Sequence, residues 1–149
     1  MSEDQTTRCG FVALIGAPNA GKSTLLNALV GAKVSIVSRK VQTTRAQVRG
    51  IALHGAAQII FVDTPGIFAP KRRLDRAMVT SAWGGASDAD VVCLLIDARK
   101  GVDEEARTIL EKLAQTTRRR TLALNKIDTI ENTQLLALAK EINELCSCL

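Results

Sequence analysis

Residues 16–23, Gly-Ala-Pro-Asn-Ala-Gly-Lys-Ser, carry the clearest chemical signal in the chain. They fit the G-x-x-x-x-G-K-[ST] pattern, in which glycines let backbone N–H groups wrap around phosphate oxygens. Lys22 brings a positive charge to the outer phosphates, and the hydroxyl of Ser23 suits a magnesium ion. An apolar run precedes this stretch and a leucine-rich helical pattern follows it. These flanks favour a phosphate-binding loop over a chance match in a glycine-rich turn.

A second motif, Asp63-Thr64-Pro65-Gly66, comes directly after an apolar run. A strand there would deliver Asp63 to the carboxyl edge of a sheet, where the phosphate loop also lies. A carboxylate at that edge can hold a water bound to magnesium, which prefers hard oxygen ligands. Gly66 can present its N–H to a terminal phosphate, because a glycine lets the backbone come close.

A third motif, Asn125-Lys126-Ile127-Asp128, indicates which base is chosen. A carboxylate only accepts hydrogen bonds, so Asp128 can take the two parallel donors of guanine, its ring N–H and its amino group. Adenine would present a lone pair at the ring position and lose this pairing. We expect Asn125 to brace the loop and touch the base, and the stem of Lys126 to cover the face of the base.

Short apolar runs alternate with amphipathic segments, which predicts an α/β fold with a mostly parallel sheet. The turn of the one expected hairpin, residues 54–57, contains His54, the only histidine, which we expect to be solvated. Strands are expected at 11–15, 47–53, 58–62, 91–96 and 121–124, helices at 23–29, 74–86, 103–114 and 135–145, and loops at 32–46 and 67–74.

The chain has 149 residues and a formal net charge of +5, which suits one domain and permits an anionic partner without requiring one. Its basic runs at 39–40, 71–73 and 118–120 are expected in loops, either solvated or facing RNA. Cys93 lies in an apolar run and is expected in the core. Cys146 and Cys148 have no nearby histidine, so we expect no metal site there. Residues 1–8 are polar, which predicts a disordered lead-in and not a signal peptide, and we expect a cytoplasmic protein.

The three motifs together resemble those of the translation-factor-related GTPases. The wording of residues 16–23, 38–45 and 61–67 is similar to that of the Era-like family of bacterial ribosome-assembly GTPases. The resemblance runs from about residue 10 to about residue 143. It implies a GTPase domain at 9–145 with the three-layer P-loop NTPase fold, one antiparallel hairpin strand and a tail at 146–149 that is foreign to the family.

The resemblance also implies a mechanism with GTP or GDP, Mg²⁺ and K⁺ as ligands. Ile67 stands where other GTPases carry a water-orienting glutamine, so the potassium ion that Asn19 would help to hold is expected to assist hydrolysis. The alternative is that Asn19 is only a turn residue. The catalytic residues would be Lys22, Asn19, Thr44 and Gly66, and the magnesium ligands Ser23, Asp63 and Thr44, or Thr43 in its place. The nucleotide contacts would be Gly16, Ala17, Pro18, Asn19, Ala20, Gly21, Lys22, Ser23, Thr24, Asp63, Thr64, Pro65, Gly66, Asn125, Lys126 and Asp128.

Proteins of this family continue with a final strand, a closing helix and an RNA-binding KH domain, none of which is recognisable here. We therefore expect exposed apolar sheet surface. The small ribosomal subunit and its rRNA are partners of intact relatives; a monomer and peripheral membrane association are also expected. One alternative is a truncated non-catalytic fragment or nucleotide-dependent binding module. A P-loop kinase is disfavoured, because the third motif has no role in phosphate transfer to a second substrate.

Overall fold

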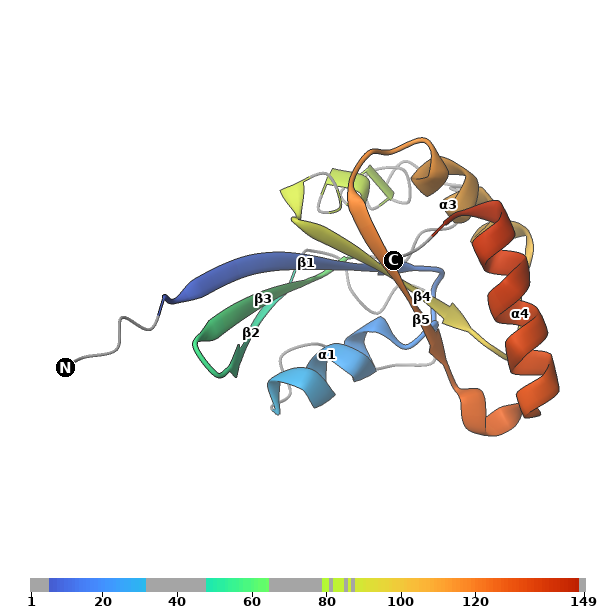
Figure 1. Cartoon of the computed structure of the whole chain (residues 1–149), viewed down its shortest axis with the longest axis horizontal. Helices are drawn as coiled ribbons and strands as arrows, with labels where there is room; N and C mark the ends of the chain where they lie inside the picture. The colour runs from blue at the N-terminus through green and yellow to red at the C-terminus, as the bar shows by residue number, and fades with distance from the viewer. Residues whose placement is uncertain are drawn as a thin grey trace.

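The computed structural model describes residues 6–31, 48–64, 79–80, 82–84, 86 and 88–147, and only the backbone of residues 48 and 49. Figure 1 shows a twisted sheet with helices on both sides. The strands are β1 (Arg8–Gly16), β2 (Val48–His54), β3 (Ala57–Asp63), β4 (Val91–Asp97) and β5 (Arg119–Asn125). The helices are α1 (Lys22–Val30), α3 (Glu104–Ala114), the 3-10 turn η1 (Ile127–Thr129) and α4 (Asn132–Leu145).

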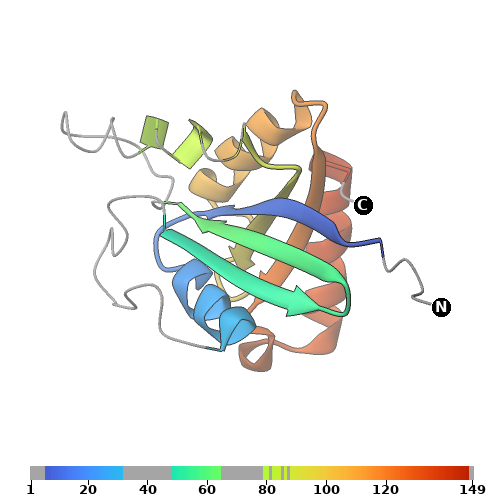
Figure 2. The same cartoon turned by 90° about the vertical axis from the view of Figure 1, so that its left-hand side faces the viewer.

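The five strands lie in the order β2-β3-β1-β4-β5. Strand β2 is antiparallel to β3, and the other neighbouring pairs are parallel. Figure 2 shows the β2–β3 hairpin alongside β1. The predicted mostly parallel sheet with one antiparallel strand is confirmed. Because β1, β3, β4 and β5 run in the same direction, their carboxyl ends meet at one edge, and all three motifs begin there.

The core lies on both faces of the sheet, as the alternation along β4 shows. Leu94 and Ile96 belong to the cluster that includes residues of α3 and α4, whereas Cys93 and Leu95 belong to the cluster that includes Leu26 of α1. Figure 1 accordingly shows α1 on one side of the sheet and α3 on the other. The prediction that Cys93 is a core residue is confirmed, and burial raises the pKa of its thiol to about 11.

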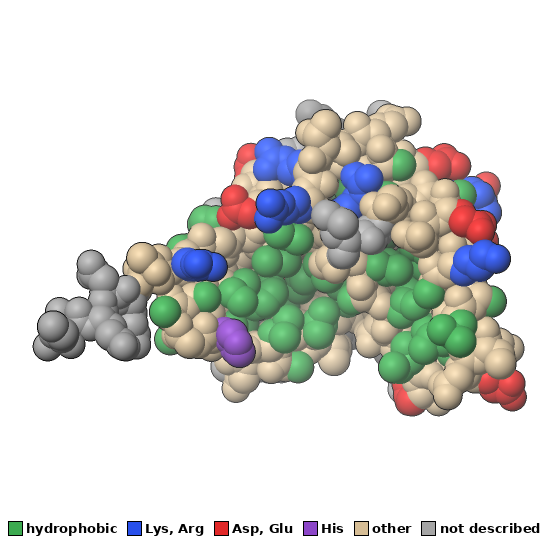
Figure 3. Space-filling view, in the orientation of Figure 1, with side chains coloured by type: hydrophobic (Ala, Val, Ile, Leu, Met, Phe, Trp, Pro, Cys, Tyr) green, Lys and Arg blue, Asp and Glu red, His purple; other side chains and the backbone are tan. Residues whose placement is uncertain are grey.

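The sheet face that carries α1 is only partly covered. Val12, Ile59 and Ala123 line this side and remain partly exposed around the buried cluster. Figure 3 shows hydrophobic side chains gathered over β1 and β3 on the face toward the viewer. Apolar side chains on this face, among the described residues, are therefore partly exposed. The exposure expected from a missing final strand and helix stays a prediction.

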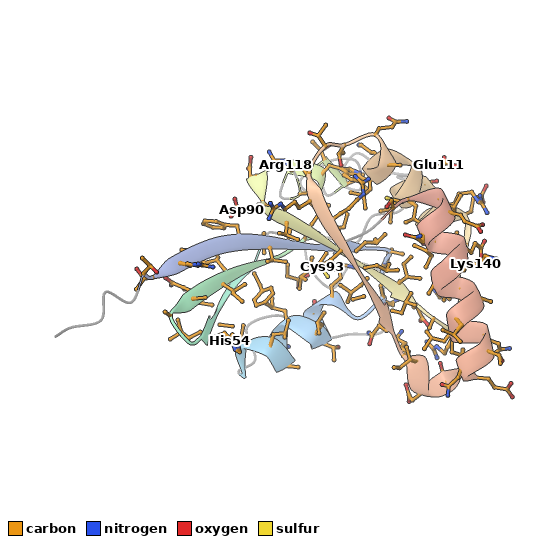
Figure 4. All side chains as sticks on the ribbon, viewed as in Figure 1. His54, Asp90, Cys93, Glu111, Arg118 and Lys140 are labelled. Atoms are coloured by element: carbon orange, nitrogen blue, oxygen red, sulfur yellow. The ribbon has the colours of Figure 1, made fainter. Side chains whose placement is uncertain are left out.

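The turn of the hairpin is shorter than predicted, because each of its two strands extends one residue further into the predicted turn. The turn is formed by Gly55 and Ala56 alone, with Gly55 at φ 58°, and His54 is the exposed last residue of β2. His54 is labelled in Figure 4 at the hairpin end of the molecule.

Strand β1 begins at Arg8, inside the expected lead-in, because the N–H of Arg8 donates to the carbonyl of Ala56 at 3.1 Å. The lead-in residues 1–5 lie outside the described residues.

The prediction that residues 118–120 form a loop is also wrong. Arg119 and Arg120 open β5. The guanidinium of Arg118, labelled in Figure 4, donates to the carbonyl of Ala89. Arg120 donates to three carbonyls, those of Leu113 at 3.1 Å, Thr116 at 3.0 Å and Ser147 at 2.8 Å. Arg120 therefore ties β5 to the end of α3, and Arg118 ties the start of β5 to the residues before β4, roles that neither interpretation of the run anticipated.

The helix ends follow local capping. The carboxylate of Asp103 accepts from the N–H of Ala106 at 2.9 Å and begins α3 where the sequence places it. Helix α4 begins three residues before its predicted start, because Glu131 and Gln134 form a capping box. Residues 79, 80, 82–84, 86 and 88 are helical, which extends the expected 74–86 helix beyond its predicted end. Residues 65–78 lie outside the described residues.

The described residues contain neither a membrane-spanning helix nor a cluster of acidic, histidine or cysteine side chains suited to a metal ion. None of their helices combines the length and the apolar character needed to cross a membrane. No group of three or more His, Cys, Asp or Glu side chains among them could hold a metal ion. Cys146 is buried, and Cys148 lies outside the described residues.

Candidate functional site

The phosphate loop connects β1 to α1 and depends on a glycine at each end. A Cβ atom at Gly16 would lie 2.6 Å from the carbonyl oxygen of Leu95, so the loop leaves β1 where only glycine fits. Gly21 has φ 104°, and a Cβ there would lie 2.1 Å from the amide nitrogen of Asn125. Between them, Asn19 adopts a left-handed conformation at φ 62°. The loop then ends at the N-terminus of α1, where helix N–H groups favour an anion.

The side chain of Lys22 folds back over the first residues of the phosphate loop. Its Nζ donates to the carbonyl of Ala17 at 2.8 Å and to that of Gly16 at 3.3 Å, and only 6% of the residue is exposed. Burial lowers the pKa of Lys22 from 10.5 to about 8, and the nearby carboxylate of Asp63 offsets part of this effect. A phosphate at this loop would supply the negative charge that the buried ammonium group needs.

Ser23 and Asp63 form a hydrogen-bonded pair of oxygen side chains beside the loop. The Ser23 hydroxyl donates to Oδ2 of Asp63 at 2.7 Å, and both residues are buried. Asp63 reaches this position because β3 pairs with β1, where it lies opposite Leu14. A hydroxyl and a carboxylate are the hard oxygen ligands that Mg²⁺ takes together with phosphate oxygens, so the pair fits that ion. The hydroxyl of Thr64 is used differently: it donates to the carbonyl of Leu14 at 2.7 Å and ties β3 to β1.

The base-recognition loop, residues 125–128, contacts the phosphate loop directly. The side-chain amide of Asn125 donates to the carbonyl of Ala20 at 3.0 Å, the brace that the sequence predicts. Nζ of Lys126 donates to the carbonyl of Asn19 at 2.8 Å. Asp128 follows in η1 and is exposed. Two motifs separated by about a hundred residues are therefore joined by two hydrogen bonds.

Asp97, at the end of β4, is a candidate site residue that lies outside the three motifs. Its carboxylate accepts from Nζ of Lys126 at 2.8 Å and from the guanidinium of Arg99 at 3.0 Å, and the residue is 6% exposed. Burial alone would raise the pKa of Asp97, but hydrogen bonds from Arg99 and Lys126 outweigh it and hold the pKa well below its usual range. The apolar run 91–96 pointed to the strand that ends here, but no motif marked the acidic residue.

The structure thus brings most of the expected site residues to one edge of the sheet. The phosphate loop, Asp63 and the loop at 125–128 lie together through the hydrogen bonds given above. Thr24 is exposed in the first turn of α1. Thr44 with its alternative Thr43, Pro65, Gly66 and Ile67 lie outside the described residues.

Comparison with known proteins gives a consistent picture. The family model described as 50S ribosome-binding GTPase matches residues 11–126. A protein named GTPase Era, from Bradyrhizobium diazoefficiens, is 67% identical over 138 residues, which cover 93% of this chain and 45% of that protein. The chain therefore spans about half the length of the curated relatives that it matches.

Solved structures agree with the sequence comparison. The crystal structure of Era in complex with MgGDPNP and nucleotides 1506–1542 of 16S ribosomal RNA superimposes with a TM-score of 0.88 at 39% identity, covering 95% of this chain and 50% of that one. NFeoB from S. thermophilus, solved bound to GDP·AlF4⁻ and K⁺, gives a TM-score of 0.60 at 25% identity, covering 80% of this chain and 45% of that one. The predicted P-loop fold is confirmed.

Proposed function

Because the chain belongs to the 50S ribosome-binding GTPase family, we propose that it binds guanine nucleotides and hydrolyses GTP to GDP and phosphate as a conformational switch. The observation that supports this most directly is the contact between the two recognition loops. Lys126 and Asn125 hydrogen-bond the backbone of the phosphate loop at Asn19 and Ala20. A single nucleotide can then reach the phosphate loop with one end and Asp128 with the other.

The phosphate end is built for charge neutralisation. The N–H groups of the loop and of the first turn of α1 would hold phosphate oxygens. Lys22 would exchange its bonds to the carbonyls of Ala17 and Gly16 for phosphate oxygens and stay protonated there. Ser23 and Asp63 would hold Mg²⁺, which would neutralise negative charge on the outer phosphates. Thr44 stays a proposed magnesium ligand, and Gly66 stays a proposed contact of the terminal phosphate.

The base end provides the selectivity. The carboxylate of Asp128 accepts the ring N–H and the amino group of guanine, and an adenine would leave it without this pairing. Exchanging Asp128→Asn replaces one acceptor by a donor, so the variant should prefer xanthine nucleotides over guanine nucleotides. A variant that kept the guanine preference would show that Asp128 does not read the base.

We further propose that a potassium ion beside the phosphates assists hydrolysis. Asn19 is an exposed residue in the middle of the phosphate loop, in a left-handed conformation. The NFeoB structure solved with GDP·AlF4⁻ and K⁺ supports the proposal, because that protein has a related fold. Turnover should be faster in KCl than in NaCl, and Asn19→Ala should remove the difference. Equal wild-type rates in both salts would contradict the potassium proposal without affecting guanine recognition.

In the cell, we propose a role in assembly of the small ribosomal subunit and maturation of its 16S-type rRNA. The support is the Era structure solved with 16S rRNA, which the chain resembles over 95% of its own length. Cytoplasmic location, a monomeric state and peripheral membrane association stay predictions from the sequence.

The decisive experiment measures fluorescent GDP binding and then phosphate release from GTP with Mg²⁺. We expect saturable GDP binding, slow turnover, and loss of turnover in Lys22→Ala. Binding without turnover would instead support the alternative of a nucleotide-dependent binding module. Absence of both binding and a cooperative thermal transition would indicate a non-functional fragment.

A further inference from the structure

The two left-handed non-glycine residues of the described chain are the two ends of one hydrogen bond. Asn19 has φ 62° and Lys126 has φ 60°. Asparagine tolerates this conformation, whereas for lysine it carries a steric penalty that the surroundings must offset. Nζ of Lys126 donates both to the carbonyl of Asn19 and to the carboxylate of Asp97, each at 2.8 Å.

Asp97 is well suited to offset that penalty. It is 6% exposed, and β4 fixes its backbone through the pair that it forms with Asn125 on β5. The turn that follows β4 adds to this, because the N–H groups of Lys100 and Gly101 both donate to the carbonyl of Asp97. The carboxylate therefore has a fixed position, from which it attracts the ammonium group at the end of a flexible stem.

We infer that Asp97 is a positioning residue for nucleotide recognition, because it holds Lys126 against the phosphate loop and so sets the distance between that loop and Asp128. The inference rests on the proposed function and extends it to a residue outside the three motifs. Asp97 acts through Lys126 and need not touch the nucleotide.

The second partner of Asp97 provides a matched control. Arg99 binds the same carboxylate from the solvent side, and its side chain is 52% exposed. Within the described part of the chain, the hydrogen bonds and the ion pair of Arg99 all go to Asp97, and none reaches the phosphate loop. Its exposed charge also interacts with the carboxylate of Asp128 through solvent, where such interactions are weak. If Asp97 served only to neutralise this arginine, Arg99→Gln and Asp97→Asn would have similar effects. If Asp97 positions Lys126, the two variants should differ.

The test compares the GDP affinity of four variants by displacement of fluorescent GDP. Loss of a charge-assisted hydrogen bond predicts that Asp97→Asn weakens GDP about 10- to 100-fold. Arg99→Gln should weaken it less than threefold. Lys126→Met should weaken it at least as much as Asp97→Asn, and the double variant Asp97→Asn with Lys126→Met should be no worse than Lys126→Met alone.

The double variant separates positioning from general stability. If Asp97→Asn lowered affinity by its full factor in the Lys126→Met background, Asp97 would not act through Lys126 and the inference would be wrong. Wild-type affinity in Asp97→Asn would also overturn it, whereas the proposed function would stand. Absence of GDP binding by the wild-type chain would contradict the proposed function instead.

A measurement without nucleotide keeps the inference testable in that case. In amide NMR spectra of the nucleotide-free chain, Asp97→Asn should shift the resonances of residues 19–21 together with those of 125–128. Arg99→Gln should leave residues 19–21 unchanged. Identical shifts at residues 19–21 in both variants, or none in Asp97→Asn, would refute a tie from Asp97 to the phosphate loop.

Discussion

The buried ammonium group of Lys22 should make the nucleotide-free domain more stable at alkaline pH. The pKa of Lys22 is about 8 in the folded chain, against 10.5 for an unperturbed lysine. Between these two values the unfolded chain binds more protons than the folded one, so the free energy of unfolding rises with pH. Below about pH 8 the lysine is charged in both states and the full destabilisation is present. Above 10.5 it is neutral in both states and the destabilisation is gone.

The size of the effect follows from the same values. A fall in pKa from 10.5 to about 8 corresponds to about 3 kcal/mol, at about 1.4 kcal/mol for each tenfold change in proton affinity. This is a large share of the roughly 5–15 kcal/mol by which a domain is stable. The exchange Lys22→Met keeps a long apolar stem and removes the charge.

The assay is urea unfolding of wild type and Lys22→Met at several pH values from 7 to 10.5, without nucleotide. Relative to the variant, the wild-type chain should gain about 3 kcal/mol across this range, while the titration of the other lysines cancels in the difference. A stability difference that stays constant with pH would refute the reasoning, as would a wild-type chain that loses stability relative to the variant.

Bound GDP should change the pKa of Lys22 in the opposite direction to burial. The phosphates of GDP place negative charge at Lys22 and raise its pKa, so GDP binding near pH 8 should take up protons. GDP affinity should then be constant below about pH 8 and fall as pH rises above it. Calorimetry in two buffers of different ionisation enthalpy measures this uptake directly. An affinity that does not change between pH 7 and 9.5 would contradict it.

Three further outcomes follow from the packing. Arg120→Ala should lower the free energy of unfolding in urea by about 1–2 kcal/mol, because three backbone carbonyls lose a donor, while Arg119→Ala should change it by less than about 0.5 kcal/mol. Gly21→Ala should weaken GDP in a displacement assay by at least about tenfold, because its Cβ meets the side chain of Asn125 at a strained φ. In timed alkylation at pH 8, Cys93 should react about 100-fold more slowly than the exposed Cys9, because burial raises its pKa.

Each of these outcomes has a clear opposite. Equal stability of the two arginine variants would mean that the carbonyl contacts of Arg120 are replaced by water without loss. Unchanged GDP binding in Gly21→Ala would mean that Asn125 can move away from the loop. Rapid alkylation of Cys93 in the folded chain would mean that the α1 face of the sheet opens readily.

The sequence predicted the sheet and the three motifs because their signals are local. The phosphate loop combines fixed glycines with a lysine and a serine, and the run 91–96 is a continuous apolar strand. The contact of the loop at 125–128 with the phosphate loop also followed, since parallel strands end at the same edge of a sheet.

The errors arose where non-local pairing decides the structure. Strand β1 extends back to Arg8 because a carbonyl at residue 56 accepts its N–H, and no pattern within residues 1–8 indicates that partner. The role of Arg120 depends on the ends of α3 and α4 meeting beside β5. Asp97 was not predicted for the same reason, because its partner Lys126 is 29 residues away along the chain.

The most direct test of the account is calorimetric titration of the 149-residue chain with GDP and, separately, with ADP in Mg²⁺ buffer. A phosphate loop joined to a carboxylate that reads guanine predicts that GDP binds at least about 100-fold more tightly than ADP. If the folded chain bound the two nucleotides equally well, Asp128 would not select the base, and the proposed guanine recognition would be wrong.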